Sequence, residues 1–270
     1  MGLELFGVLQ LAFLSLGTLD NINLMQSPLK QLKGVNGLNL NIGPDSSTAR
    51  LLQVFTSERI NAIDYRANFL RNCNLMLALV LAVMAIGFVL FLLTLLCKNC
   101  VPCFYKLGHR IFKEVLLTLI LFNSLNFAYA AGIHFKYAPA GDSLYLLGTL
   151  AAVSTLVVPL IMMIALECSE EEGFGEFKLK LKEGCLEKAY FVATLLYRMG
   201  IGLYLAAGNE NDLSTLLILA LSLLFLLYNL VNLPFVRAYH NYRANICHFT
   251  QFIILFVAMY YRSMKSTTPL

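Results

Sequence analysis

One run of residues constrains the fold of this chain more than any other feature of its sequence. Residues 74–96 form an apolar stretch of 23 residues without a single charge. As a helix this stretch is about 35 Å long, enough to cross the roughly 30 Å hydrocarbon core of a bilayer with some tilt. In lipid only helices and closed barrels satisfy every backbone N–H and C=O group, and the run is continuous where a barrel strand would alternate. The run therefore predicts a membrane-spanning helix.

Further apolar runs are spaced as in a multi-pass protein. They cover residues 115–132, 144–166, 189–207, 213–233 and 246–261, and a weaker run at 3–16 is interrupted by Glu4 and Gln10. The chain is 59% hydrophobic and 13% charged, whereas soluble domains carry about 25% charged residues. We expect an all-α membrane protein, a bundle of six to seven transmembrane helices.

The runs divide the chain into four parts. Residues 1–17 are a first hydrophobic helix or a signal peptide, 18–72 an extracytosolic loop with an amphipathic helix, 73–262 the six-helix transmembrane bundle and 263–270 a short tail. Ser15 and Gly17 offer a small-x-small cleavage site, but the segment lacks a positively charged start and contains Glu4. Both alternatives leave the loop on the same side of the membrane.

Basic residues in the connections predict the orientation. Four Lys or Arg lie in residues 97–114, four in 167–188 and two in 234–245, whereas 133–143 contains only Lys136 and 208–212 contains none. Cytosolic loops are enriched in Lys and Arg, so we expect the three basic connections in the cytosol. The loop at 18–72 and the C-terminal tail then face the outside or a lumen, in the plasma membrane or an endomembrane.

Polar side chains within the predicted spans are the candidate functional residues. Arg198 lies near the middle of its span. In a functional role it lines a polar cavity or binds an anionic group. In a structural role it pairs with helix-end carbonyls or reaches the membrane surface. The neutral candidates are Asn123, Asn126, Asn229, Asn232, His248 and Gln251, which either join helices by hydrogen bonds or line a substrate path. His134 sits at a span end and needs no special role.

Two further patterns concern helix packing and the membrane interface. Gly148 with Ala152, and Gly202 with Ala206, are pairs of small residues four apart, which is typical of close helix contacts in membranes. The chain has no Trp, so we expect Tyr residues near span ends to form the interfacial belt. These residues are Tyr105, Tyr145, Tyr190, Tyr228, Tyr260 and Tyr261.

Cys97, Cys100 and Cys103 form a C-x2-C-x2-C pattern at the end of the strongest span. The pattern lacks the fourth Cys of an iron–sulfur motif, and His109 is the only nearby residue that would complete a zinc site. We therefore expect no metal here. Cysteines beside a span and close to basic residues are typical palmitoylation sites, and otherwise they are reduced cytosolic thiols.

The motifs that the sequence lacks exclude several classes of function. The sequence contains no H-E-x-x-H, no G-x-S-x-G and no phosphate-binding glycine loop, so we expect neither enzyme activity nor a cofactor. It also lacks a basic patch with interleaved aromatic residues, which argues against a nucleic acid partner. No span carries Asp or Glu near its centre, which argues against proton- or metal-coupled transport. The expected partners are membrane lipids, and homo-oligomerisation stays open.

Short motifs over most of the chain resemble those of one membrane-protein family. They comprise the Gln10-containing helix at 6–16, the segment 36–39, the basic entry into a span at 106–127, Gly-Phe-Gly-Glu-Phe at 173–177, Leu-Leu-Tyr-Arg at 195–198, Leu-Pro-Phe at 233–235 and Asn-Ile at 245–246. In this order they resemble the membrane domain of fungal and protist transient-receptor-potential-like proteins, which include the flavin-carrier group.

The resemblance implies a channel- or transporter-like domain that passes cations or a small solute. The alternative is a non-transporting seven-helix sensor or anchor, the C-terminal membrane part of a larger surface protein. The resemblance also implies an ectodomain and one further span upstream of Met1. Channels of this name have a long outer loop between their last two spans, whereas the connection here, 234–245, is short and expected in the cytosol.

Overall fold

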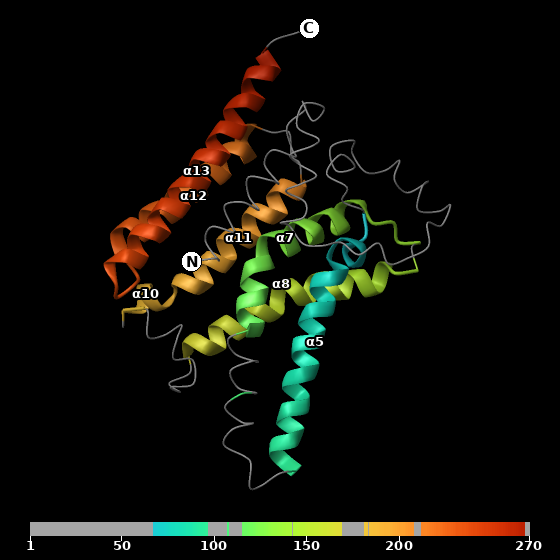
Figure 1. The fold of residues 1–270 in the computed structure, drawn as a ribbon. Helices are drawn as coiled ribbons and strands as arrows, with labels where there is room; N and C mark the ends of the chain where they lie inside the picture. Colours follow the sequence, from blue (N-terminus) through green and yellow to red (C-terminus); the bar gives the residue numbers. More distant parts are fainter. Residues whose placement is uncertain are drawn as a thin grey trace.

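The structure is a computed structural model that describes residues 67–96, 107, 115–141, 143–168, 181–182, 184–207 and 212–267. The helices in these ranges are α5 (Phe69–Leu96), α7 (Leu116–Tyr137), α8 (Tyr145–Cys168), α10 (Cys185–Lys188), α11 (Tyr190–Ala207), α12 (Asp212–Asn232) and α13 (Ala238–Thr267), as shown in Figure 1. The described part of the chain is all-α and contains no strand, and one isolated antiparallel bridge joins Leu181 to Phe235.

Each long apolar run that falls in the described ranges forms a helix, with some shifts of its ends. Helix α5 begins before residue 74 because Asn68 caps it, its Oδ1 accepting the N–H of Leu70 at 3.0 Å. Helix α13 extends beyond the last run at both ends, from Ala238 to Thr267. The predicted helix at 1–17, the amphipathic helix within 18–72 and the cysteines Cys97, Cys100 and Cys103 lie outside the described residues.

Three of the helices are long and apolar enough to cross a bilayer. They contain the windows Met76–Leu93 in α5, Tyr145–Ala165 in α8 and Tyr190–Ala207 in α11, and Leu216–Asn232 in α12 is a shorter apolar helix. A helix of this length and composition matches the hydrocarbon thickness of a bilayer. These helices indicate a membrane protein.

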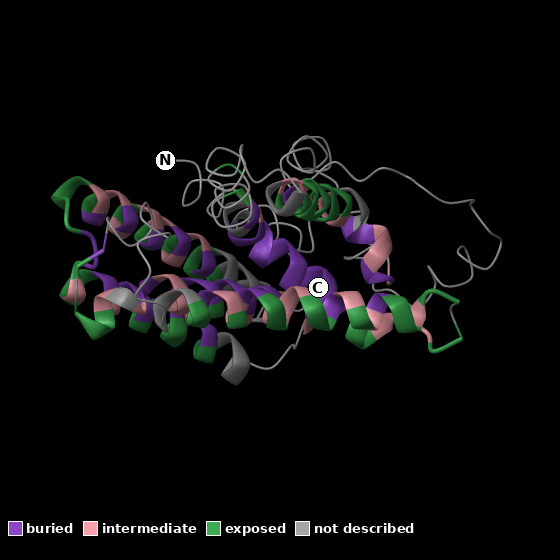
Figure 2. Cartoon of the chain, turned by 90° about the horizontal axis from the view of Figure 1, so that it is seen from below, coloured by how far each residue is buried: buried purple, intermediate pink, exposed green. Residues whose placement is uncertain are grey.

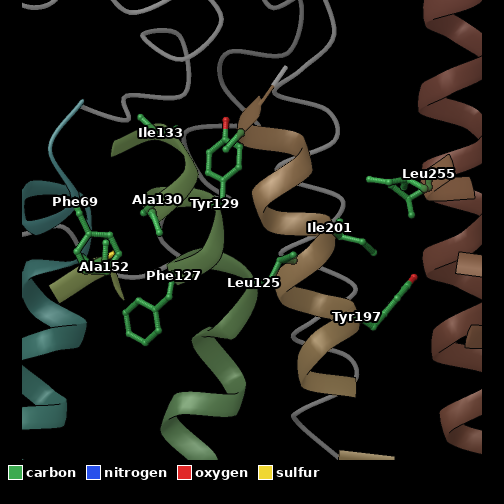
Figure 3. Packing of buried hydrophobic residues seen from close by; sticks show 14 of the residues in the cluster. Phe69, Leu125, Phe127, Tyr129, Ala130, Ile133, Ala152, Tyr197, Ile201 and Leu255 are labelled. Atoms are coloured by element: carbon green, nitrogen blue, oxygen red, sulfur yellow. The ribbon is translucent and has the colours of Figure 1, made fainter. Parts of the chain in front are cut away.

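Helix α7 lies at the centre of the bundle. It contacts α5, α8 and α11, and all its residues from 123 to 131 are buried. Figure 3 shows the cluster that results, with Leu125, Phe127, Tyr129 and Ala130 of α7 among Phe69 of α5, Ala152 of α8 and Ile201 of α11. A helix buried on every side must satisfy each of its polar groups within the protein, so α7 is where the polar residues of the sequence need partners.

The other helices surround α7 unevenly. Helices α12 and α13 lie side by side, joined by a short turn at 233–237 (Figure 1). The apolar window of α11 is 56% buried, whereas that of α5 is only 6% buried, so α5 exposes large side chains such as Leu81 and Phe88. In Figure 2 the buried residues gather between the helices and the exposed residues lie on their outer surfaces. A large exposed apolar surface of this kind fits contact with lipid.

Small residues let α7 and α11 approach closely. A Cβ atom added at Gly202 would lie 2.6 Å from the carbonyl oxygen of Leu125 and 2.8 Å from the Cβ of Ala128. A Cβ atom added at Gly132 would lie 2.5 Å from the Cβ of Ala206. The predicted close contact at Gly202 and Ala206 is therefore confirmed, and its counterpart on α7 is the pair Ala128 and Gly132.

The second predicted pair of small residues lies on α8. Ala152 is fully buried, and a Cβ atom added at Gly148 would lie 2.9 Å from Cε1 of His134 and 3.1 Å from Oδ1 of Asn68. This pair also marks a close contact, because it lets α8 lie against the end of α7 and the start of α5.

We expect Gly202→Ala to destabilise the protein, because the new methyl group meets backbone atoms of α7 that move only if the helices separate. Overpacking of this kind costs about 1–3 kcal/mol. Gly200→Ala is the matched control, since a Cβ atom there meets Leu221 Cδ2 at an ordinary 3.9 Å and the helix propensity of Ala is higher. Thermal unfolding in detergent should give a lower Tm for Gly202→Ala alone. Equal Tm values for the two variants would contradict the close contact.

Asn241 holds the turn between α12 and α13. Its Oδ1 accepts the N–H of Phe235 and its Nδ2 donates to the carbonyl of Phe235, both at 2.8 Å. Leu233 in this turn has a φ of 43°, a left-handed conformation that costs a non-glycine residue about 1–2 kcal/mol. The N–H of Lys182 also donates to the carbonyl of Pro234 at 2.9 Å, so the turn is joined to the segment before α10. These bonds fix the position at which α13 starts.

Asn241→Ala should lower the stability of the protein, because the buried N–H and C=O of Phe235 lose their side-chain partner. Each buried polar group without a partner costs about 1–3 kcal/mol. Tyr242→Ala is the control, because Tyr242 is 70% exposed and does not hold the turn. Thermal unfolding in detergent should lower the Tm for Asn241→Ala well below that of Tyr242→Ala. If the two Tm values coincide, the turn does not depend on the Asn241 side chain.

Candidate functional site

The structure places the predicted polar residues in three groups. Arg198 of α11 lies in the part of the bundle that contacts α7, the helix that carries Asn123 and Asn126. His248 and Gln251 of α13 lie among aromatic residues of α11 and α12. Asn229 and Asn232 are on α12, the first fully buried and the second partly buried. All these side chains except Asn232 are less than 4% exposed.

Arg198 is bound to the backbone of a neighbouring helix. Its Nη1 donates to the carbonyl oxygen of Leu121 at 3.1 Å, and the hydroxyl of Ser124 donates to the same oxygen at 2.9 Å. The carbonyl lies within α7 rather than at its end. A guanidinium in this position carries its charge into the bundle, so carbonyl oxygens that face it reduce the cost of burial.

The Asn side chains bond mainly within their own helices. The Nδ2 atoms of Asn123, Asn229 and Asn232 each donate to the carbonyl four residues earlier, at 3.0, 2.8 and 3.0 Å respectively. Among the described residues the Oδ1 atoms of Asn123 and Asn229 have no hydrogen-bond partner. Each of these two amides therefore offers a buried acceptor that the described part of the protein does not use.

His248 makes hydrogen bonds on both ring nitrogens, and one of them joins α13 to α11. Its Nδ1 lies 3.1 Å from Oε1 of Gln251, and its Nε2 lies 3.3 Å from the hydroxyl of Tyr190. An amide oxygen only accepts, so Nδ1 donates to Gln251. The Nδ1 bond lies within α13, and the Nε2 bond connects α13 to the start of α11.

Aromatic rings enclose the imidazole of His248. The ring of Phe225 lies 4.8 Å away at 87°, and the ring of Tyr197 lies 6.3 Å away at 85°. Tyr197 also stacks on Phe225 at 4.4 Å and donates its hydroxyl to Ser222 at 3.2 Å. We call Tyr190, Tyr197, Ser222, Phe225, His248 and Gln251 the His248 cluster.

Sequence reasoning identified only two members of the His248 cluster. Tyr190 was predicted to lie at the membrane interface, and the structure shows in addition that it is 2% exposed and bonds to His248. Its position at the start of a span gives no sign of this contact, which joins residues 58 apart.

His134 was also misjudged. It lies near the end of α7, as predicted, but it is fully buried and bonds to the first residue of α5 and to Thr149 of α8. The contact with Phe69 joins residues 65 apart, so spacing within one helix could not reveal it.

Metal ligands do not gather anywhere in the described ranges. No group of three or more His, Cys, Asp or Glu residues among them could hold a metal ion. The sequence was also compared with protein-family models and curated proteins, and the fold with solved structures, and no match was found. The resemblance to transient-receptor-potential-like proteins therefore stays a prediction.

We expect Arg198→Ala to lower the Tm in detergent, because it removes a buried charged donor from the carbonyl of Leu121. Hydrogen bonds to charged groups contribute about 1.5–3 kcal/mol. Arg198→Lys should keep most of the stability, since an ammonium also donates to a carbonyl. Leu196→Ala is the control, at a position that is 52% exposed on the same helix. A normal Tm for Arg198→Ala would show that this residue has no structural role.

Proposed function

We propose that the chain is the multi-pass membrane domain of a channel or transporter and passes a small polar solute or a monovalent cation. The observation that carries the proposal is the His248 cluster, in which polar side chains of α11, α12 and α13 meet inside an apolar bundle. Ionisable residues within membrane helices are costly and usually mark substrate or ion pathways.

The lengths of the helices are those expected if more helices cross the bilayer than the three most apolar helices. Helix α7 has 22 residues, α12 has 21 and α13 has 30, so each is at least about 30 Å long. If α5, α7, α8, α11, α12 and α13 all cross the bilayer, the bundle has the six spans predicted from the sequence. The resemblance to transient-receptor-potential-like proteins implies passage of cations or small solutes.

The chemistry of the His248 cluster limits the class of solute. Its polar atoms are those of the hydroxyls of Tyr190, Tyr197 and Ser222, the amide of Gln251 and the imidazole of His248. The buried oxygen of Asn229 lies on the same helix as Ser222, two turns away. Divalent cations prefer carboxylate ligands. Neutral oxygens are better suited to a neutral polar solute or to a monovalent cation.

A non-transporting sensor or anchor is the competing function. It is favoured by the fact that the polar atoms of the His248 cluster bond to one another, which also describes a network that only joins helices. The two functions differ in one measurable property, since only the first requires flux across the membrane.

The proposal is tested with purified protein in liposomes. Uptake of radioactive rubidium measures the passage of monovalent cations, and swelling of the liposomes in glycerol measures the passage of neutral solutes. We expect flux of at least one, and we expect His248→Phe to reduce it about tenfold or more, because the variant loses a hydrogen-bonding group worth about 1.4 kcal/mol or more. Phe249→Leu is the control, because Phe249 is 52% exposed on the other face of α13.

Three results would decide between the functions. Flux that falls in His248→Phe but not in Phe249→Leu, with equal Tm values, supports transport through the cluster. Flux that is equal in both variants places the path elsewhere and contradicts the proposed site. Absence of flux for both probes in folded wild-type protein favours the sensor or anchor.

A further inference from the structure

A short segment before α11 binds the turn between α12 and α13. The N–H of Lys182 donates to the carbonyl of Pro234 at 2.9 Å, and Leu181 forms an antiparallel bridge with Phe235. Figure 1 shows α10, which follows these residues in the chain, at the same end of the bundle as this turn. We call Leu181, Lys182 and α10 together the α10 strap.

The strap is also bound to the body of α12. The hydroxyl of Tyr228 donates to the carbonyl of Leu186 in α10. Tyr228 lies in the last turns of α12, and its ring stacks on that of Phe225 with 5.9 Å between the ring centroids. Because Phe225 belongs to the His248 cluster, the residue that binds the strap is a direct neighbour of that cluster.

The strap is joined just as directly to α11. The N–H of Ala189 donates to the carbonyl of Cys185 at 3.2 Å, and the N–H of Ala193 donates to the carbonyl of Ala189 at 2.9 Å. Ala189 is the single residue between α10 and α11, so helical hydrogen bonds continue from one helix into the other. A segment that is fixed to α11 at one end therefore binds α12 and the α12–α13 turn along its length.

Tyr190 connects the strap to the His248 cluster. It is buried with Leu181, Phe235 and Ala244 in an apolar cluster, and its ring centroid lies 4.9 Å from that of Phe235. Its hydroxyl lies 3.3 Å from Nε2 of His248. A displacement of the turn away from Tyr190 therefore also moves α13 away from the hydroxyl that His248 contacts.

The turn that the strap binds has a strained backbone. Leu233 has a φ of 43°, a conformation that non-glycine residues rarely adopt unless the surrounding contacts hold it. The next residue, Pro234, is the one whose carbonyl accepts the N–H of Lys182. Strain of this kind is common in segments that switch between two arrangements. Loss of the strap contacts therefore lets the turn relax, and the start of α13 moves with it.

We infer that the α10 strap is a conformational latch. It keeps the His248 cluster closed by holding the α12–α13 pair against α11, and its release opens the cluster. The strap lies within residues 167–188, a connection predicted to face the cytosol, so the latch is controlled from the cytosolic side. Opening of the cluster is a property of the fold, whereas passage of a solute on opening rests on the proposed function.

The inference is tested by the reactivity of a thiol placed in the cluster. Ser222→Cys, at a position that is 2% exposed, is reconstituted in liposomes and treated with N-ethylmaleimide, and mass spectrometry follows the initial rate of modification at position 222. A buried thiol reacts in those molecules in which its surroundings have opened. The native Cys73 on α5, which is 1% exposed, measures global unfolding in the same sample.

Tyr228→Phe in this background removes one bond of the strap and keeps the ring that stacks on Phe225. We expect modification at position 222 to become about two to ten times faster, because one hydrogen bond changes the population of the open state by about this factor. Tyr242→Phe is the matched control, since Tyr242 is 70% exposed, and it should leave the rate unchanged. Equal rates in the two variants, or an equal increase at Cys73, would overturn the inference.

A disulfide across the bridge tests the opposite direction. Leu181→Cys with Phe235→Cys places two thiols on paired residues of an antiparallel bridge, where a Cα separation of about 4.5–5.5 Å suits a disulfide. Comparison of the oxidised with the reduced form of this variant cancels the effect of the substitutions themselves, and mass spectrometry confirms the intended disulfide. We expect modification at position 222 to be about tenfold slower or more in the oxidised form. The same rate in both forms contradicts a latch at this position.

Flux separates the latch from the proposed function. In liposomes that contain the protein with its native Ser222, Tyr228→Phe should raise the passage of rubidium or glycerol by about two- to tenfold, whereas Tyr242→Phe should not. Wild-type flux that stays unchanged in Tyr228→Phe overturns the inference. Absence of wild-type flux together with faster modification at position 222 rejects the proposed function and supports the latch.

Discussion

The close contact between α7 and α11 is the constraint on which the rest of the bundle depends. Lipid is as apolar as the side chains of the spans, so helices associate there through van der Waals packing and hydrogen bonds rather than through burial from water. Gly132 and Gly202 bring the two backbones together, and the guanidinium of Arg198 reaches the carbonyl of Leu121 across the contact. Because α7 also contacts α5 and α8, its position against α11 determines where those helices lie.

Polar side chains act in two distinct ways in this bundle. Asn123, Asn229 and Asn232 donate within their own helices, and these bonds contribute nothing to helix association. His134 and His248 instead bond across helices, the first to Phe69 of α5 and Thr149 of α8 and the second to Tyr190 of α11. The two imidazoles therefore connect different helices although their chemistry is the same.

The sequence predicted the helices well because one physical rule governs them. In lipid a long apolar run satisfies its backbone polar groups by forming a helix, and each such run in the described part of the chain is helical. The small-residue pairs at Gly148 and Gly202 were found for a similar reason, since close approach requires them. The partners of the polar residues could not be found in this way. Arg198 and Leu121 are 77 residues apart, and periodicity along one helix does not say which helix faces it.

The two contacts of α11 differ in the kind of atom that makes them. Against α7 the contact is backbone to backbone through glycine, and such a contact cannot slide without a steric clash. Against α12 and α13 it is made by side chains, chiefly the stacking of Tyr197 on Phe225 and the bond of Tyr190 to His248. Side chains can change rotamer without displacing a helix, whereas two backbones packed against each other must move as whole helices. Any movement that opens the His248 cluster is therefore expected in the α12–α13 pair, with α7 and α11 remaining together.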